Sequence, residues 1–137
     1  MVGVDGSEDS AAAVTFAARE ADRFGEPLTV IYSWFAPQPW ADSTASLLWP
    51  TEPREEDRLV VAEAIAGLAD MYPDLDLRTD VVVADPVNAL RHGSAGARLL
   101  VVGSRGRHGF TKALLGSVSE QLVWALPCPV AVIRAEG

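Results

Sequence analysis

The stretch that decides the fold reads Leu99-Leu100-Val101-Val102-Gly103-Ser104-Arg105-Gly106-Arg107-His108-Gly109. Its first part, residues 99–102, is short and entirely apolar, as in a strand of a parallel sheet that is buried on both faces. A glycine-rich loop follows and leads to Gly116-Ser117-Val118-Ser119, where we expect a helix over residues 117–125. Strand, loop and helix in this order predict a unit of an α/β fold.

The same alternation extends outward over the whole chain. Strands are expected at residues 2–4, 28–32, 77–83, 99–102 and 130–133. Helical periodicity is expected between residues 7 and 25, over 54–71, from Asp85-Pro86 onward and over 117–125, with a long proline-containing loop at 35–53 that carries Trp40 and Trp49. Strands and helices that alternate are joined by right-handed crossovers. We therefore expect one α/β domain over residues 1–137, a doubly wound five-stranded parallel sheet with helices on both faces.

Composition narrows the class of protein. The chain has 137 residues, the usual size of one domain, and a net charge of −8, with 19 acidic against 11 basic residues. Such acidity argues against nucleic acid as a general partner and otherwise serves solubility. One cysteine builds neither a disulfide nor a cysteine-based zinc site. No apolar run reaches the roughly 18 residues of a membrane span, and the N-terminus lacks a signal-peptide pattern, so we expect a cytoplasmic protein.

The glycine-rich loop has the chemistry of a phosphate site. Gly103 and Gly106 lack a Cβ, so their backbone can approach an anion closely and adopt positive φ. Gly116 leads into a helix whose N-terminal N–H groups and macrodipole attract negative charge. Further donors and positive charge are available from Arg105, Arg107, Ser117 and Ser119.

Two simpler interpretations of this loop remain open. Glycines after a strand often do no more than form a turn. The sequence Ser117-Val118-Ser119-Glu120 also fits a capping box, which requires no ligand. His108 can contact a phosphate or lie in solvent on the loop.

Several sharper motifs are missing. The chain has no Gly-x-x-x-x-Gly-Lys-Ser/Thr, which excludes a P-loop enzyme, and no Gly-x-Gly-x-x-Gly dinucleotide fingerprint. A nucleophile elbow fails because Val102 occupies its first glycine position. Only His92 and His108 are available to a hydrolase triad.

At this loop the sequence resembles the universal stress protein family. The family motif is Gly, two residues, Gly, nine residues, then Gly-Ser or Gly-Thr, and Gly103, Gly106, Gly116 and Ser117 match it without a gap. The resemblance covers essentially the whole chain. It includes Val2-Gly3-Val4-Asp5-Gly6-Ser7 at the first strand, residues 28–33 at the second, and Pro127-Cys128-Pro129-Val130 before the last. Two departures are a short first strand and Arg98, where the family commonly has a small polar or acidic residue.

The resemblance implies a Rossmann-like sheet in the order 3-2-1-4-5, with the ligand crevice between strands 1 and 4. It also implies ATP, or another adenine nucleotide, with Mg²⁺ held mainly by the phosphates. Gly3 and Asp5 would lie near the ribose and the backbone of Ser33 near the adenine. The phosphates would be surrounded by Gly103, Ser104, Arg105, Gly106, Arg107, His108, Gly109, Gly116, Ser117, Val118 and Ser119. A homodimer is implied through the last strand, which is made of Val130, Ala131, Val132 and Ile133.

We therefore expect an ATP-binding protein with a regulatory, stress-response role and little or no catalysis, because no pair of residues is an evident base and nucleophile. One alternative is a weak ATPase or nucleotide-transferring enzyme. The related ATP pyrophosphatases, however, carry a Ser-Gly-Gly-x-Asp-Ser loop after strand 1, where this chain has Asp5-Gly6-Ser7-Glu8-Asp9-Ser10. Another alternative is an interaction module whose nucleotide site stays unoccupied.

Overall fold

The computed structural model describes residues 1–34, 51–107, 115–125 and 127–136. The predictions made for Trp40, Trp49, His108 and Gly109 lie outside these residues.

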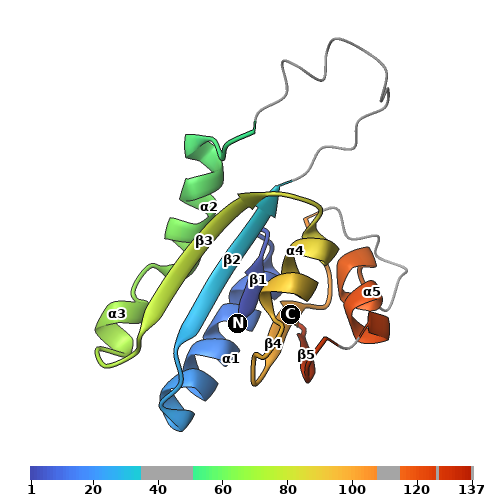
Figure 1. The fold of residues 1–137 in the computed structure, drawn as a ribbon. Helices are drawn as coiled ribbons and strands as arrows, with labels where there is room; N and C mark the ends of the chain where they lie inside the picture. The colour runs from blue at the N-terminus through green and yellow to red at the C-terminus, as the bar shows by residue number, and fades with distance from the viewer. Residues whose placement is uncertain (35–50, 108–114, 126, 137) are drawn as a thin grey trace, which may run out of the picture.

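The structure is built on one five-stranded sheet (Figure 1). Its strands run in the order β3-β2-β1-β4-β5, and every neighbouring pair is parallel. In chain order they are β1 (Val2–Val4), β2 (Leu28–Trp34), β3 (Leu77–Val83), β4 (Leu100–Gly103) and β5 (Val130–Ile133). The predicted fold class and strand order are confirmed. Two predicted bounds shift, because β2 continues to Trp34 and β4 begins and ends one residue later than expected.

Helices cover both faces of this sheet. One face packs against α1 (Glu8–Phe24) and α2 (Glu55–Ile65), and the opposite face against α4 (Pro86–Gly93) and α5 (Ser117–Ala125) (Figure 1). The interior strand β4 contributes to both sides, since Val101 belongs to the first core and Leu100 and Val102 to the second. Its three apolar residues are at most 4% exposed, as the apolar sequence predicted.

The sequence around α1 explains why this helix packs closely on the sheet. Its hydroxyl-bearing N-cap, Ser7, accepts a hydrogen bond from the backbone N–H of Ser10, and its C-cap, Gly25, has a φ of +64°. The buried face is made of small residues: Ala13, Val14, Ala17, Ala18 and Ala21. Phe24 shares their periodicity but is 47% exposed at the helix end. Close packing of α1 brings its first turn against the end of β4.

The helix predicted over residues 54–71 is in fact two helices. Helix α2 ends at Ile65, and the single turn α3 (Leu68–Met71) begins after Gly67. Gly67 has a φ of +79°, a left-handed conformation that interrupts a helix and that glycine adopts without strain. The interruption reorients the chain so that Leu68 is buried in the core. Apolar periodicity spans the break, so it predicts one continuous helix and was wrong here.

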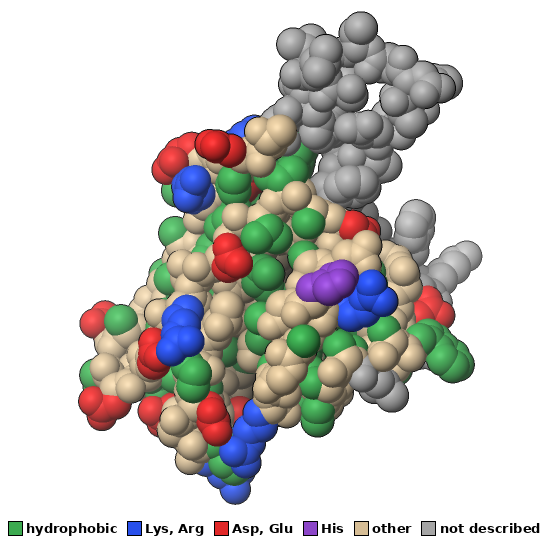
Figure 2. Space-filling model, viewed as in Figure 1, with side chains coloured by type: hydrophobic (Ala, Val, Ile, Leu, Met, Phe, Trp, Pro, Cys, Tyr) green, Lys and Arg blue, Asp and Glu red, His purple; other side chains and the backbone are tan. Residues whose placement is uncertain are grey.

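No helix in the described part of the chain is long and apolar enough to cross a membrane. Figure 2 shows acidic and basic side chains interspersed over α2 on the face that it presents.

Candidate functional site

A cavity of about 200 Å³ lies beyond the carboxyl ends of β1 and β4, where the winding of the sheet reverses. This is the place where open α/β sheets bind ligands. Its wall combines segments far apart in the sequence, namely the ends of β1, β2 and β4, the glycine-rich loop, and the first turns of α4 and α5. The predicted site residues that line it are Gly3, Asp5, Ser33, Gly103, Arg105, Gly106, Gly116, Ser117, Val118 and Ser119.

One part of the wall is apolar and was not predicted. Its residues come from β1, β2 and β4 and from α4, and they are Val4, Ile31, Pro86, Leu90 and Val102. The Asp85 side chain fixes the start of α4 as its N-cap, accepting a hydrogen bond from the Asn88 N–H at 2.9 Å. Val4 and Val102 stand near the carboxyl ends of their strands, and this is the sequence signal that would have identified these two.

Asp5 connects the two loops that border the cavity. Its Oδ1 accepts a hydrogen bond from the backbone N–H of Ser7 at 2.9 Å. Its Oδ2 accepts one from the backbone N–H of Arg107 at 3.0 Å. A carboxylate offers about four lone-pair sites, so two remain for other donors. Asp5 therefore braces the site and can still accept hydrogen bonds from a ligand hydroxyl.

Asp9, on the first turn of α1, connects the glycine-rich loop to another part of the chain. Its Oδ2 accepts hydrogen bonds from Ser104 Oγ at 2.6 Å and from the Arg105 N–H at 3.0 Å. Its Oδ1 accepts one from the Ala135 N–H at 2.9 Å. Nothing local in the sequence shows these distant partners of Asp9.

The loop glycines are required by close packing rather than by positive φ. A Cβ on Gly103 would lie 2.9 Å from the backbone of Asp9 and Ser10, and one on Gly106 would lie 2.8 Å from Asp5 Oδ2. Neither glycine has positive φ, contrary to the sequence-based expectation. Positive φ occurs instead at Gly6, at +82°, in the turn after β1. Glycine at these positions lets the loop lie directly against α1 and Asp5.

Two predicted phosphate ligands have other roles in the structure. Ser104 is 5% exposed; its N–H donates to the Ile133 carbonyl oxygen at 2.6 Å and its hydroxyl donates to Asp9. The backbone N–H of Arg107 is bonded to Asp5, and its side chain lies beside Gly6 rather than in the cavity wall. These residues hold the loop in shape rather than facing the cavity.

The start of α5 faces the cavity. The Gly116 carbonyl accepts the Glu120 N–H at 2.9 Å, so the helix begins at Ser117 and the capping box centred on Ser117 does not form. Ser119 donates its hydroxyl hydrogen to the carbonyl oxygens of Ser104 and Gly116, at 3.1 and 3.0 Å. N–H groups in a first helical turn have no intrahelical acceptor, so those of Ser117 and Val118 are available to an anion.

Arg105 supplies the positive charge of the cavity wall. Its Nε is buried without a hydrogen-bond partner among the described residues. An unsatisfied buried donor is unfavourable and rare in folded proteins. Ser33, on the opposite side, is not free in this way, because its hydroxyl donates to the Ala84 carbonyl oxygen at 2.6 Å. Arg105 thus brings to this wall a guanidinium with one unsatisfied nitrogen.

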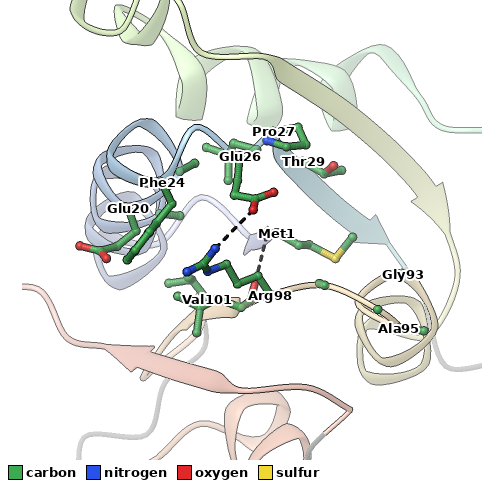
Figure 3. Close-up of a pocket in the computed structure, with 16 residues that line it drawn as sticks. Met1, Glu20, Phe24, Glu26, Pro27, Thr29, Gly93, Ala95, Arg98 and Val101 are labelled. Atoms are coloured by element: carbon green, nitrogen blue, oxygen red, sulfur yellow. Dashed lines mark hydrogen bonds and ion pairs between the residues drawn. The ribbon is translucent and has the colours of Figure 1, made fainter.

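A larger cavity, of about 470 Å³, lies at the amino ends of β2 and β4 (Figure 3). Its cationic groups already have partners. Arg98 Nη1 is 3.4 Å from Glu26 Oε1 and its guanidinium stacks 4.1 Å from the Phe24 ring centroid, while the Met1 amino group donates to the Leu99 carbonyl oxygen. Burial lowers the pKa of that amino group. The described residues of the glycine-rich loop and the start of α5 do not line this cavity. They line the smaller cavity instead.

The comparisons with known proteins agree with this geometry. The model of the universal stress protein family matches residues 1–134. Among curated proteins, universal stress protein Rv2005c of Mycobacterium tuberculosis is 38% identical over 98% of this chain and 44% of its own length. A universal stress protein of Mycolicibacterium smegmatis is 37% identical over 98% of this chain and 45% of its own. The chain thus spans less than half the length of these relatives.

Solved structures show the same fold. The universal stress protein UspA of Lactobacillus plantarum has a TM-score of 0.73 at 23% identity, covering 97% of this chain and 96% of its own. A universal stress protein solved in complex with cAMP has a TM-score of 0.72 at 26% identity, covering 98% and 94% of the two chains. With the family match over nearly all its residues, this chain belongs to the universal stress protein family.

Proposed function

We propose that this protein binds an adenine nucleotide, with ATP as the physiological ligand, in the cavity between β1 and β4. The single observation that carries the proposal is the buried, unpartnered Nε of Arg105 in a cavity wall that also contains the start of α5. A guanidinium and a helix N-terminus are complementary to phosphate. The solved relative in complex with cAMP, at 26% identity, supports adenine as the base.

The remaining walls fit the other parts of such a ligand. The apolar side chains from Val4, Ile31 and Val102 suit the faces of a flat base. The free lone pairs of Asp5 suit ribose hydroxyls. Among the described residues no group of three or more Asp, Glu, His or Cys side chains can hold a metal ion. In this proposal Mg²⁺ is held mainly by the ATP phosphates.

A regulatory role with little or no catalysis is part of the proposal. Among the described residues that line the cavity, Asp5 is the only carboxylate, and it is already bonded to two backbone N–H groups. Efficient hydrolysis needs a base placed to activate water. We also propose a homodimer through β5 and a cytoplasmic location.

Calorimetric titration of the purified chain with ATP, AMP, cAMP and GTP tests the proposal. We expect the adenine nucleotides to bind in the presence of Mg²⁺ and GTP to bind more weakly, because the family resemblance puts the Ser33 backbone beside the adenine, whose hydrogen-bonding edge differs from that of guanine. We expect phosphate release far below the common enzyme rate of about 10 per second. Binding of none of the four nucleotides would refute the proposal, and turnover near that rate would favour the weak ATPase.

A further inference from the structure

Asp9 joins three elements that are distant in the sequence. Its two carboxylate oxygens receive Ser104 Oγ and the Arg105 N–H on one side and the Ala135 N–H on the other, at 2.6, 3.0 and 2.9 Å. Asp9 itself lies on the first turn of α1, while Ala135 follows the end of β5. One side chain thus contacts both the glycine-rich loop and the segment after β5.

A second bond closes these contacts into a ring. The Ser104 N–H donates to the Ile133 carbonyl oxygen at 2.6 Å, so the loop also contacts the last residue of β5 directly. Ser104 is 5% exposed, while Asp9 and Ala135 are partly exposed, so the ring is partly shielded from water. Closely spaced bonds in a shielded site act together, and loss of one weakens the others.

Arg105 links this ring to the cavity. Asp9 fixes its backbone, while its side chain lines the cavity with Nε unpartnered. A ligand that accepts a hydrogen bond from this guanidinium will restrain Arg105, and the restraint will act on the hydrogen bond between Arg105 and Asp9. The other oxygen of the same carboxylate holds Ala135.

We propose that Asp9 is a positioning residue of the nucleotide site, which sets Arg105 toward the phosphate and couples occupancy of the site to residues 134–136. The proposal rests on the proposed function, because the ligand that it requires is the phosphate of an adenine nucleotide. Coupling between two sites is reciprocal. Nucleotide therefore orders the segment after β5, and detaching that segment weakens nucleotide binding by the same factor.

Two variants and one control test the coupling in the whole chain. Asp9→Asn keeps the shape of the side chain but replaces one carboxylate oxygen with an NH₂ group. This NH₂ group faces N–H or O–H donors and cannot accept a hydrogen bond from them. Ala135→Pro leaves Asp9 intact and removes only the donor from the segment after β5. Glu136→Pro is the matched control, because it introduces the same ring one residue later. ATP affinity is measured by calorimetry, and backbone exchange at residues 134–136 by hydrogen exchange with and without ATP.

We expect ATP to slow exchange at residues 134–136 in the wild type and at residues 134 and 135 in Glu136→Pro, whose proline has no N–H, and to leave exchange unchanged in Asp9→Asn. Asp9→Asn and Ala135→Pro should bind ATP at least about fivefold more weakly, the lower end of typical coupling between sites. If Asp9→Asn does not fold, Ala135→Pro carries the test. If Asp9 had a purely structural role, Asp9→Asn would lower stability, and ATP would not slow exchange at residues 134–136 even in the wild type.

Wild-type ATP binding with unchanged exchange at residues 134–136 would overturn this proposal alone. So would a folded Ala135→Pro or Asp9→Asn variant with wild-type affinity. A wild type that binds no adenine nucleotide would instead refute the proposed function, and this proposal would fall with it.

Discussion

At the scale of single residues, Asp5 has the most roles to separate. Its carboxylate braces the Ser7 turn and the Arg107 backbone, and the proposed function gives it the ribose hydroxyls as well. Because both loops depend on it, loss of affinity in a variant does not by itself show a ligand contact. The test must therefore combine a substitution of Asp5 with a nucleotide that lacks the ribose hydroxyls.

We predict that the wild type binds ATP more tightly than 2′,3′-dideoxy-ATP by about 1.5–3 kcal/mol, the usual value for a hydrogen bond to a charged group. Asp5→Ala should bind the two nucleotides equally, because the acceptor is gone. Competition calorimetry measures both differences. Equal affinity of the wild type for the two ligands would show that Asp5 only braces the loops.

Sequence reasoning identified the cavity residues better than their individual roles. The spacing of Gly103, Gly106 and Gly116 located the loop, and close packing against Asp9, Ser10 and Asp5 explains the glycines at 103 and 106. It did not show that Ser104 and Ser119 are turned into the loop's own hydrogen bonds. Nor did it identify Asp9, whose partners lie some hundred positions away along the chain. Such roles depend on tertiary contacts that no local pattern records.

At the scale of the elements, the interruption between α2 and α3 predicts the sign of the stability change when Gly67 is replaced. Gly67→Ala should destabilise the protein by about 1–2 kcal/mol, since an L-residue is strained at positive φ. Nothing lies within 4 Å of the added Cβ, so the effect comes from the backbone alone. Denaturant unfolding measures it. In a continuous helix the same substitution would stabilise by up to about 1 kcal/mol, and that result would contradict the observed break.

The contact between β2 and α2 gives a prediction on pH. The pKa of Tyr32 is raised above 10.0, first by burial and then by the charge of Asp57, with Asp5 adding to this and Arg107 and Arg54 opposing it. The folded state therefore keeps the proton after the unfolded chain has lost it. Stability should be independent of this group below about pH 10 and fall as the pH rises above that value.

Tyr32→Phe tests that prediction, because it removes the ionisable group and keeps the buried ring. Urea unfolding of both proteins between pH 8 and 11 gives the free energy of unfolding at each pH, where about 8 and about 11 bracket the unperturbed tyrosine value. We expect the wild type to lose more stability than Tyr32→Phe over the upper part of this range. If the free energy of unfolding depended on pH in the same way in both proteins, the raised pKa of Tyr32 would be ruled out.

At the scale of the whole molecule, the strand order places β5 at an edge of the sheet. Among the described strands it pairs only with β4, and Val130, Ala131, Val132 and Ile133 are all partly exposed. An apolar edge strand invites pairing with another chain unless it is covered. Pairing of two identical edges by a two-fold axis closes at a dimer.

We predict that Val132→Glu and Ala131→Asp each convert a β5 dimer to monomer, because a charge would be buried at the centre of the interface. Light scattering at tens of micromolar protein measures the mass, a concentration at which a micromolar dimer is populated. A monomeric wild type would exclude this interface. A dimer that survives both substitutions would direct attention to another apolar surface, such as that of Trp124 on α5, which is 83% exposed.

Alternation of strands and helices was sufficient to predict a doubly wound parallel sheet, because each βα crossover has a fixed hand. It did not determine which strands are neighbours. That order came from the family resemblance and is confirmed by the pairing of β1 with both β2 and β4. The location of the cavity then follows from topology, since the reversal of winding at β1 and β4 is where Asp5 and the glycine-rich loop meet.

Ser117→Glu is the most direct test of whether phosphate binds at the start of α5. Ser117 is the exposed first residue of the helix, where an added carboxylate stabilises the helix by about 0.3–1 kcal/mol but repels a phosphate. Gln121→Glu adds the same charge one turn farther along and serves as the control. In calorimetric titration with ATP we predict at least about tenfold weaker binding for a stably folded Ser117→Glu, equivalent to about 1.4 kcal/mol, and near wild-type binding for Gln121→Glu. Wild-type affinity in Ser117→Glu would show that phosphate does not bind at the start of α5.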